Sequence, residues 1–247
     1  MIIISPAKRQ DPSMGNRSKS LPVCLPKTQS LLSDIVTLDE KQLRKALDVS
    51  EAIGKDAWAT FQSLASEGFN EMQVTASIDL YQGDVYKALD VQTLTVEDLE
   101  FMENNLRILS AFYGLLKPLD GIWPYRLEMG SRLPQYPDLA QYWAGAVTEV
   151  VRAEKPSYIF NLASVQYAKA IHQEHGATWI DIVFQDKDQK GQYRVIAVRA
   201  KKMRGLMLRY MVKNRVTHPE QLLGFNENNY VFNQAESSPT RLVFRSI

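Results

Sequence analysis

The segment that most constrains the fold is residues 110–130, SAFYGLLKPLDGIWPYRLEMG. Gly114 stands where a tight reversal needs a positive φ, a conformation that glycine adopts without steric cost. Pro118 prevents a helix from continuing through the segment, and Gly121 and Pro124 leave little room for a regular second helix. We therefore expect the chain to turn here, among aromatic and charged side chains that a plain packing segment does not need.

Helices and strands alternate irregularly over the rest of the chain. Capping residues and helical spacing of apolar residues predict helices over 37–47, 50–65, 95–109, 137–153, 164–174 and 200–215. Apolar runs predict strands over 2–4, 78–81, 158–162, 178–184, 193–198 and 242–245. The polar turn 186–191 joins two of these strands into a hairpin. Because the elements follow no regular βαβ cadence, and no linker or repeat separates them, we expect one compact α+β domain over residues 1–247.

Composition narrows the class and location of the protein. No apolar run approaches the roughly 20 residues that a helix needs to cross a bilayer. The start, MIIISPAK, has neither the basic segment nor the small-residue cleavage site of a signal peptide. One cysteine, Cys24, excludes an intrachain disulfide and suits a reducing compartment. We therefore expect a cytoplasmic protein with no membrane partner. The three histidines form no typical ligand pattern, so we expect no metal and no cofactor.

The formal net charge of +1 hides a strong polarity along the chain. Residues 31–103 contain 15 Asp and Glu against 5 Lys and Arg, whereas residues 189–219 contain nine Lys and Arg and no acidic residue. The first 20 residues add four cations against one Asp. A strongly positive segment in a balanced protein favours a local anion site, and the alternative is an exposed helix face that is merely solvated.

The most informative predicted helix is AKKMRGLMLRYMVKNR, residues 200–215. Its apolar residues recur at helical spacing, which predicts a core-facing side. Lys202, Arg209 and Lys213 fall on one flank of that side, and Arg204 and Arg215 on the other. Gly205 inside the helix costs roughly 1 kcal/mol relative to Ala, so we expect another backbone or a ligand to approach it closely.

The turn at 113–118, YGLLKP, is similar to the hairpin of helix-hairpin-helix modules, in which backbone N–H groups bind a nucleic-acid phosphate. Oriented N–H groups can bind an anion without a positive side chain. The chain departs from that pattern at Ala111, which stands at one plausible glycine position.

Several longer strings resemble the YaaA family of bacterial peroxide-stress proteins. They occur in the family's order: ISPAK (4–8), GDVY (83–86), YGLLKPLD (113–120), PYRLEMG (124–130), NLAS (161–164), AKKMRGLMLRYMVKNR (200–215) and GFN (224–226). The resemblance implies a cytoplasmic protein that protects bacteria during hydrogen peroxide stress by limiting unincorporated intracellular iron. It also implies a fold particular to the family, with a positive cleft and a helix-hairpin-helix-like element that bind double-stranded DNA.

With this resemblance, the cations predict a cleft that binds duplex DNA. Cations from three distant regions would converge around the turn at 113–118 and hold DNA through phosphate contacts, with strong salt dependence and little sequence preference. The expected DNA- or anion-binding residues are Lys8, Tyr113, Gly114, Lys117, Arg126, Lys201, Lys202, Arg204, Arg209 and Lys213.

The alternative is an enzyme that acts on a small anionic or nucleotide-like substrate in the same cleft. The catalytic candidates are Lys8, Arg126 and Glu128, because Lys8 follows a buried strand and the other two lie on one face of a short strand. A structural salt bridge is the competing interpretation of the Arg126–Glu128 pair. Asp84 and Tyr86 could contribute, as could Asn161 and Ser164 at another strand-to-helix junction. No known catalytic motif is present in the sequence, so no reaction is assigned. The oligomeric state stays open.

Overall fold

Five parallel strands form the middle of the fold, and shorter antiparallel strands lie beside them. The computed structural model describes residues 1–15, 17–69 and 73–247. Its large sheet has the order β4-β3-β1-β6-β7-β10-β9, with β8 paired to β7. The parallel strands are β1 (Ile2–Ile4), β3 (Leu106–Ser110), β6 (Tyr158–Asn161), β7 (Thr178–Lys187) and β10 (Arg241–Ser246). The antiparallel ones are β4 (Gly114–Leu116), β8 (Tyr193–Arg194) and β9 (Tyr230–Phe232). A separate antiparallel pair joins β2 (Thr75–Ala76) to β5 (Gly121–Ile122).

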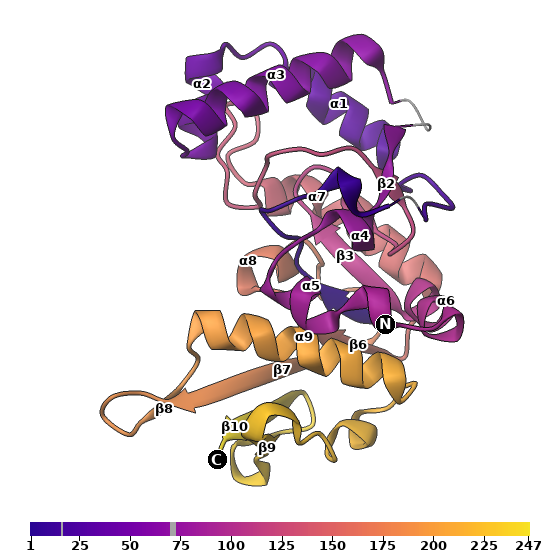
Figure 1. Ribbon diagram of the computed structural model, residues 1–247, viewed down its shortest axis with the longest axis vertical. Helices are drawn as coiled ribbons and strands as arrows, with labels where there is room; N and C mark the ends of the chain where they lie inside the picture. The colour runs from indigo at the N-terminus through magenta and orange to yellow at the C-terminus, as the bar shows by residue number, and fades with distance from the viewer. Residues whose placement is uncertain (16, 70–72) are drawn as a thin grey trace.

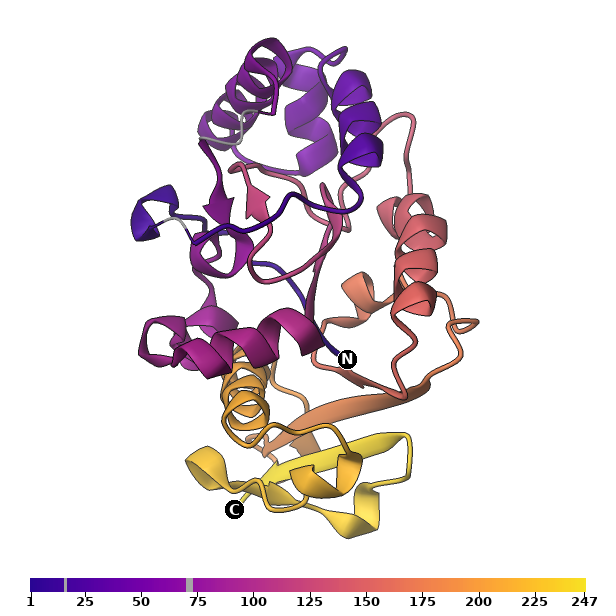
Figure 2. The ribbon, with the colours of Figure 1, turned by 90° about the vertical axis from the view of Figure 1, so that its right-hand side faces the viewer.

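The helices lie around this sheet and at one end of the molecule. They are α1 (Leu25–Ile35), α2 (Glu40–Leu47), α3 (Glu51–Glu67), α4 (Ser77–Leu80), α5 (Asp84–Leu89), α6 (Val96–Asn105), α7 (Leu139–Glu154), α8 (Val165–Ala168) and α9 (Ala197–Lys213). Short 3-10 helices cover Pro12–Met14, Val91–Thr93, Pro219–Leu222, Glu227–Asn229 and Gln234–Glu236. Figures 1 and 2 show α1–α3 at one end and β9 with β10 at the other. Among the helices of the described residues, none is long and apolar enough to span a membrane.

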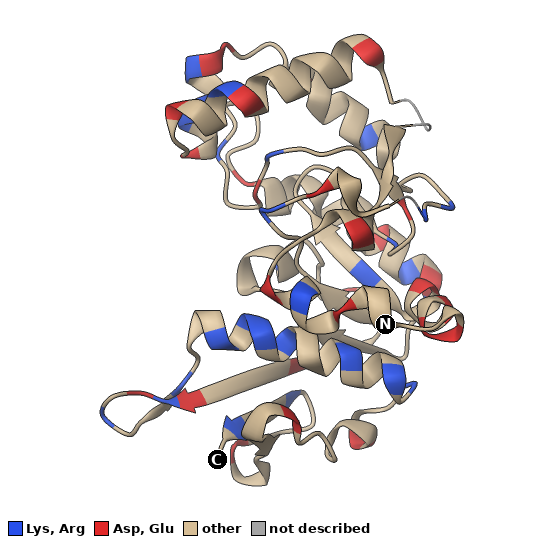
Figure 3. Ribbon diagram, in the orientation of Figure 1, with Lys and Arg blue, Asp and Glu red and all other residues tan. Residues whose placement is uncertain are grey.

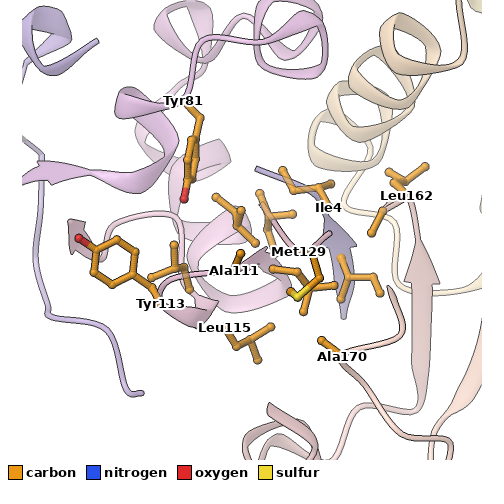
Figure 4. Packing of buried hydrophobic residues seen from close by; sticks show 14 of the residues in the cluster. Ile4, Tyr81, Ala111, Tyr113, Leu115, Met129, Leu162 and Ala170 are labelled. Atoms are coloured by element: carbon orange, nitrogen blue, oxygen red, sulfur yellow. The ribbon is translucent and has the colours of Figure 1, made fainter. Parts of the chain in front are cut away.

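The central strand β1 is buried on both faces. Ile2, Ile3 and Ile4 are at most 1% exposed, because β1 pairs with β3 on one side and β6 on the other while helices cover the sheet. A continuous apolar run is typical of a strand in such a parallel sheet. Figure 4 shows Ile4 in the core with Met129 and Leu162, which come from distant parts of the chain. The predicted mixture of helices and strands in one domain is confirmed, and the structure adds that the central strands are parallel.

Four predicted elements differ from the structure. One is the strand expected over 193–198, which ends at Arg194 and is followed from Ala197 by α9. The helix expected to reach residue 109 ends at Asn105, and residues 106–110 form β3 instead. All five residues of β3 are buried, and a short buried run fits a strand and a helix equally well by periodicity. The strand expected at 78–81 is mostly the short helix α4, and the helix expected over 164–174 is only the four residues of α8. The hairpin of β7 and β8 is confirmed.

Helix α9 packs directly against α5 at Gly205. A Cβ atom at Gly205 would lie 2.2 Å from the carbonyl oxygen of Val85 and 2.7 Å from the Cβ of Ala88. The expectation of a close backbone approach at this glycine is therefore confirmed, and the neighbour is a second helix. On its other side α9 contacts β7, so the helix is held between α5 and the sheet.

We predict that Gly205→Ala destabilises the protein, although alanine favours a helix. The added methyl group would overlap the α5 backbone, and such overpacking costs about 1–3 kcal/mol. Gly145 in α7 is the matched control, because its Cβ would meet no described atom within 4 Å and this exposed helix position should gain ~1 kcal/mol from alanine. Urea unfolding of both variants measures the difference. Equal stabilisation by both substitutions would contradict the packing described here.

Candidate functional site

A pocket of about 480 Å³ opens at the carboxyl ends of β1 and β6. Its walls include residues 5–9, which follow β1, and Leu162 and Ser164, which follow β6. From β1 the chain goes on to β3 on one side, whereas from β6 it goes on to β7 on the other. Such a place, where the chain continues from two neighbouring strands toward opposite sides of the sheet, is where ligands of open parallel sheets bind. The volume of the pocket lies within the range of small-molecule sites.

Hydrogen bonds hold the walls of the pocket in place. The backbone N–H of Ser164 donates to Ser5 Oγ at 2.9 Å, which joins the two strand-end loops. The Tyr86 hydroxyl donates to the Ser5 carbonyl oxygen at 2.9 Å. Tyr125 is held by its hydroxyl, which lies 2.8 Å from Ser110 Oγ and 2.9 Å from the Tyr81 hydroxyl. Burial raises the pKa of Tyr86 and Tyr125 well above the usual range, so both phenols are neutral.

One carboxylate in the pocket already binds two cations. Glu128 Oε1 lies 2.7 Å from Lys8 Nζ and 3.4 Å from an Arg126 guanidinium nitrogen. All three residues line the pocket. The predicted charged pair of Arg126 and Glu128 is therefore present, and Lys8 joins it from the loop after β1. Lys8 is 66% exposed, so its ion pair lies at the solvent side of the site.

Two further cations reach the same pocket from α9 and have no partner in the described part of the chain. Lys201 and Arg204 stand one helical turn apart, and neither has an ion pair or hydrogen bond among the described residues. Arg204 is partly buried, and this burial lowers the pKa of its guanidinium. A buried charge without a counter-ion is unfavourable, so an anion bound here would remove that cost. Figure 3 shows the cations distributed along α9.

The other expected cations of α9 lie outside the pocket. Lys202 is exposed, and its Nζ lies 3.4 Å from Asn228 Oδ1. Arg209 donates to the carbonyl oxygens of Leu89 and Asp90 at 2.7 and 3.1 Å, where it caps the C-terminus of α5.

Lys213 is tied to α6 by an ion pair with Asp98, which also binds Arg215 at 2.7 Å. Burial alone would raise the pKa of the Asp98 carboxyl. The hydrogen bonds from Lys213, the Thr95 amide and Arg215 outweigh burial and hold this pKa well below its usual range. These contacts fasten α9 to its neighbours.

Residues 113–118 end the turn after β3 and form strand β4, and none of them is among the described residues that line this pocket. Ser110 pairs with Gly114 across the antiparallel strands β3 and β4, so the two helices of a helix-hairpin-helix do not flank the turn. Gly114 has a φ of +74°, as predicted, and its missing side chain leaves room for Trp143. Tyr113 is 0% exposed and donates to the Trp123 carbonyl oxygen at 2.9 Å, so its ring is not available for stacking on a ligand.

Lys117 lines a different cavity of about 260 Å³, together with the buried Asp120. Burial raises the pKa of the Asp120 carboxyl to about 6, although hydrogen bonds from Ser20 Oγ and the Lys117 amide lower it in part. The bond from Ser20 Oγ to Asp120, with backbone bonds beside it, holds the loop before α1 against the turn that follows β4.

Besides the exposed cation Arg9 in the loop after β1, sequence reasoning missed the pocket residues Gln166 and Tyr167. Both belong to α8, which follows β6, and the position just after a parallel strand was the available signal.

Among the described residues, no group of three or more His, Cys, Asp or Glu side chains is arranged to hold a metal ion.

We predict that Asp120 makes stability depend on pH. Its folded pKa, about 6, exceeds the unfolded value of about 3.9. Folding therefore favours the protonated form, whose contribution is complete below pH 4 and is lost as the pH rises through 6. The loss, relative to Asp120→Asn, should be about 3 kcal/mol. Urea unfolding of both proteins from pH 4 to 7.5 measures it, and parallel curves would contradict the prediction.

We predict that Glu128→Gln strengthens the binding of inorganic phosphate. The carboxylate now competes for Lys8 and Arg126, and its removal frees both cations. The gain should be about 1 kcal/mol, or roughly fivefold in the dissociation constant, for a partly exposed site. Isothermal titration calorimetry compares it with Glu149→Gln, an exposed carboxylate of α7 outside the pocket. Weaker phosphate binding by Glu128→Gln would be the contrary result.

Comparison with known proteins agrees with the motifs noted above. A family model described as peroxide stress protein YaaA matches residues 1–236. The chain is also 36% identical over 251 residues to UPF0246 protein AM1_4276 of Acaryochloris marina (strain MBIC 11017), and the alignment covers 99% of this chain and 98% of that protein. Both matches extend over almost the whole chain. The chain therefore belongs to the peroxide stress protein YaaA family.

Proposed function

We propose that the protein serves the peroxide-stress response by binding an anionic ligand in the pocket between β1 and β6. The family description supports the general role in peroxide stress. The observation that carries the proposal is the pair Lys201 and Arg204. Both favour an anionic ligand because they line one pocket and have no counter-ion among the described residues. Lys8 and Arg126 bring further positive charge to the pocket, and both bind the carboxylate of Glu128.

The neighbouring lysines of α9 give a sharp test. Lys201 lines the pocket, whereas Lys202 is exposed and lies outside it. Lys201→Gln should weaken the binding of inorganic phosphate or pyrophosphate roughly tenfold, the equivalent of ~1.4 kcal/mol. Lys202→Gln should change the phosphate affinity less than about twofold, because salt largely screens an exposed charge outside the pocket. Calorimetry measures both. Equal effects of the two substitutions would contradict an anion site in the pocket.

Double-stranded DNA is the second candidate ligand. The observation that favours it is the exposure of three cations, Lys8, Lys201 and Lys202, near the mouth of the pocket or on the adjoining side of α9. A duplex lying across the mouth would place phosphates on these side chains, and its binding would weaken steeply with salt.

DNA and a small ligand make different demands on Lys202. For a duplex, Lys201→Glu and Lys202→Glu should weaken binding to a similar degree, and each should reduce the slope of log K against log salt by ~1. Fluorescence anisotropy with a labelled duplex, titrated with salt, measures this. If DNA binding ignores both salt and the charge reversals, the duplex is not held by these cations.

An effect on free iron is proposed as a consequence of ligand binding. The residues that line the pocket are mostly cations and neutral groups, which suit anions and not iron ions. The protein would then limit unincorporated iron through the bound ligand or DNA, without storing the metal itself.

A further inference from the structure

We infer that the ligand of the pocket is a mononucleotide, with its phosphate on Lys201 and Arg204 and its base against Tyr167 and Gln166. This inference rests on the proposed anion site and specifies its ligand. Three properties of the pocket carry it: a volume far larger than a phosphate group, an accessible apolar wall beside the cations, and hydrogen-bonding groups that have no partner within the described part of the chain.

The size of the pocket excludes a bare phosphate as the ligand that fills it. At about 480 Å³ the cavity would hold roughly 16 waters at the ~30 Å³ that each occupies in the liquid. A phosphate on Arg204 would leave most of that space open. The planar guanidinium of Arg204 suits a phosphate group because it can donate two parallel hydrogen bonds. The remaining volume matches the sugar and base that such a phosphate carries.

The wall beside the cations is apolar and partly accessible. Pro6, Ala7 and Val85 are partly buried residues of the lining, and so is Tyr167. The ring of Tyr167 offers a flat surface, and a base stacked on an aromatic side chain gains affinity in a manner that tolerates any base. A sugar phosphate without a base would leave this wall in contact with water.

Two polar side chains of α8 that line the pocket keep hydrogen-bonding capacity for a ligand. Gln166 has no side-chain hydrogen bond among the described residues, and its amide can donate and accept at a base edge. Its position is defined by Gly130, where a Cβ would lie 2.1 Å from Gln166 Nε2. The Tyr167 hydroxyl accepts a bond from the Met129 amide at 3.4 Å, which leaves its own proton to donate.

A carboxylate, Asp84, also lines the pocket. Asp84 is exposed and has no partner in the described residues. It begins α5, which packs directly against the helix that carries Lys201 and Arg204. A carboxylate next to a phosphate site repels a simple anion, but it accepts hydrogen bonds from sugar hydroxyls, as carboxylates do in dinucleotide sites. This favours a ligand with hydroxyl groups adjoining its phosphate.

The test compares ligands that differ by one part. Isothermal titration calorimetry of the full chain measures AMP, GMP, CMP, UMP, ribose 5-phosphate and inorganic phosphate. We expect at least one mononucleotide to bind ~10-fold or more tightly than ribose 5-phosphate, because base stacking adds to phosphate binding. Two variants separate the parts of the site. Arg204→Met should weaken the mononucleotide and ribose 5-phosphate by the same factor, and Gln166→Leu should weaken only the mononucleotide.

Two contrary outcomes are distinct. If ribose 5-phosphate and inorganic phosphate bind as tightly as every mononucleotide, and Arg204→Met weakens all of them, the base site is wrong and the anion site stands. If Arg204→Met affects none of the ligands, the anion site of the proposed function fails as well. Asp56→Asn, an exposed carboxylate of α3, is the control for Asp84→Asn, which should reduce the affinity for ribose 5-phosphate relative to inorganic phosphate. Thermal unfolding of each variant verifies that it is folded.

Discussion

The contact of α9 with α5 at Gly205 sets the orientation on which the pocket depends. Because a glycine allows the α5 backbone to touch the helix, α9 cannot rotate about its own axis without losing that contact. Its methionine face is then directed into the core, where Met203 and Met207 are at most 1% exposed. With those two sides occupied, the turn that carries Lys201 and Arg204 faces the ends of β1 and β6.

Parallel strands explain why residues so distant in sequence share one site. Each parallel strand ends at the same edge of the sheet, so the loops after β1 and β6 meet there, although Ser5 and Ser164 are 159 residues apart in sequence. Lys8 comes from the first loop and Gln166 from the second. The extended segment that carries Arg126 and Glu128 passes between them and supplies the carboxylate. The site thus follows from strand direction more than from any single motif.

The parts of this arrangement that depend on local chemistry could be predicted. The apolar face of the helix at 200–215, the close approach at Gly205, the positive φ of Gly114 and the pairing of Arg126 with Glu128 all follow from short-range spacing and are confirmed. The identity of β3 could not be predicted, because a short, fully buried run has the same periodicity in a helix and in a strand. The residue pattern YGLLKP at 113–118 is similar to the hairpin between two helices, but a glycine reversal serves a strand pair equally well.

The fate of each cation depended on partners far away in sequence. Arg209 and Lys213 looked equivalent to Lys201 along the helix, yet the first caps α5 and the second binds Asp98, about 115 residues earlier. A sum of charges over residues 189–219 therefore overstates the positive surface. Folding gives Arg209 and Lys213 partners in neighbouring helices, whereas Lys201 and Arg204 have none among the described residues and line the pocket. An unpaired, partly buried guanidinium lowers the stability of the ligand-free protein. The same property of Arg204 gives the pocket its affinity for an anion, because a bound anion supplies the missing partner.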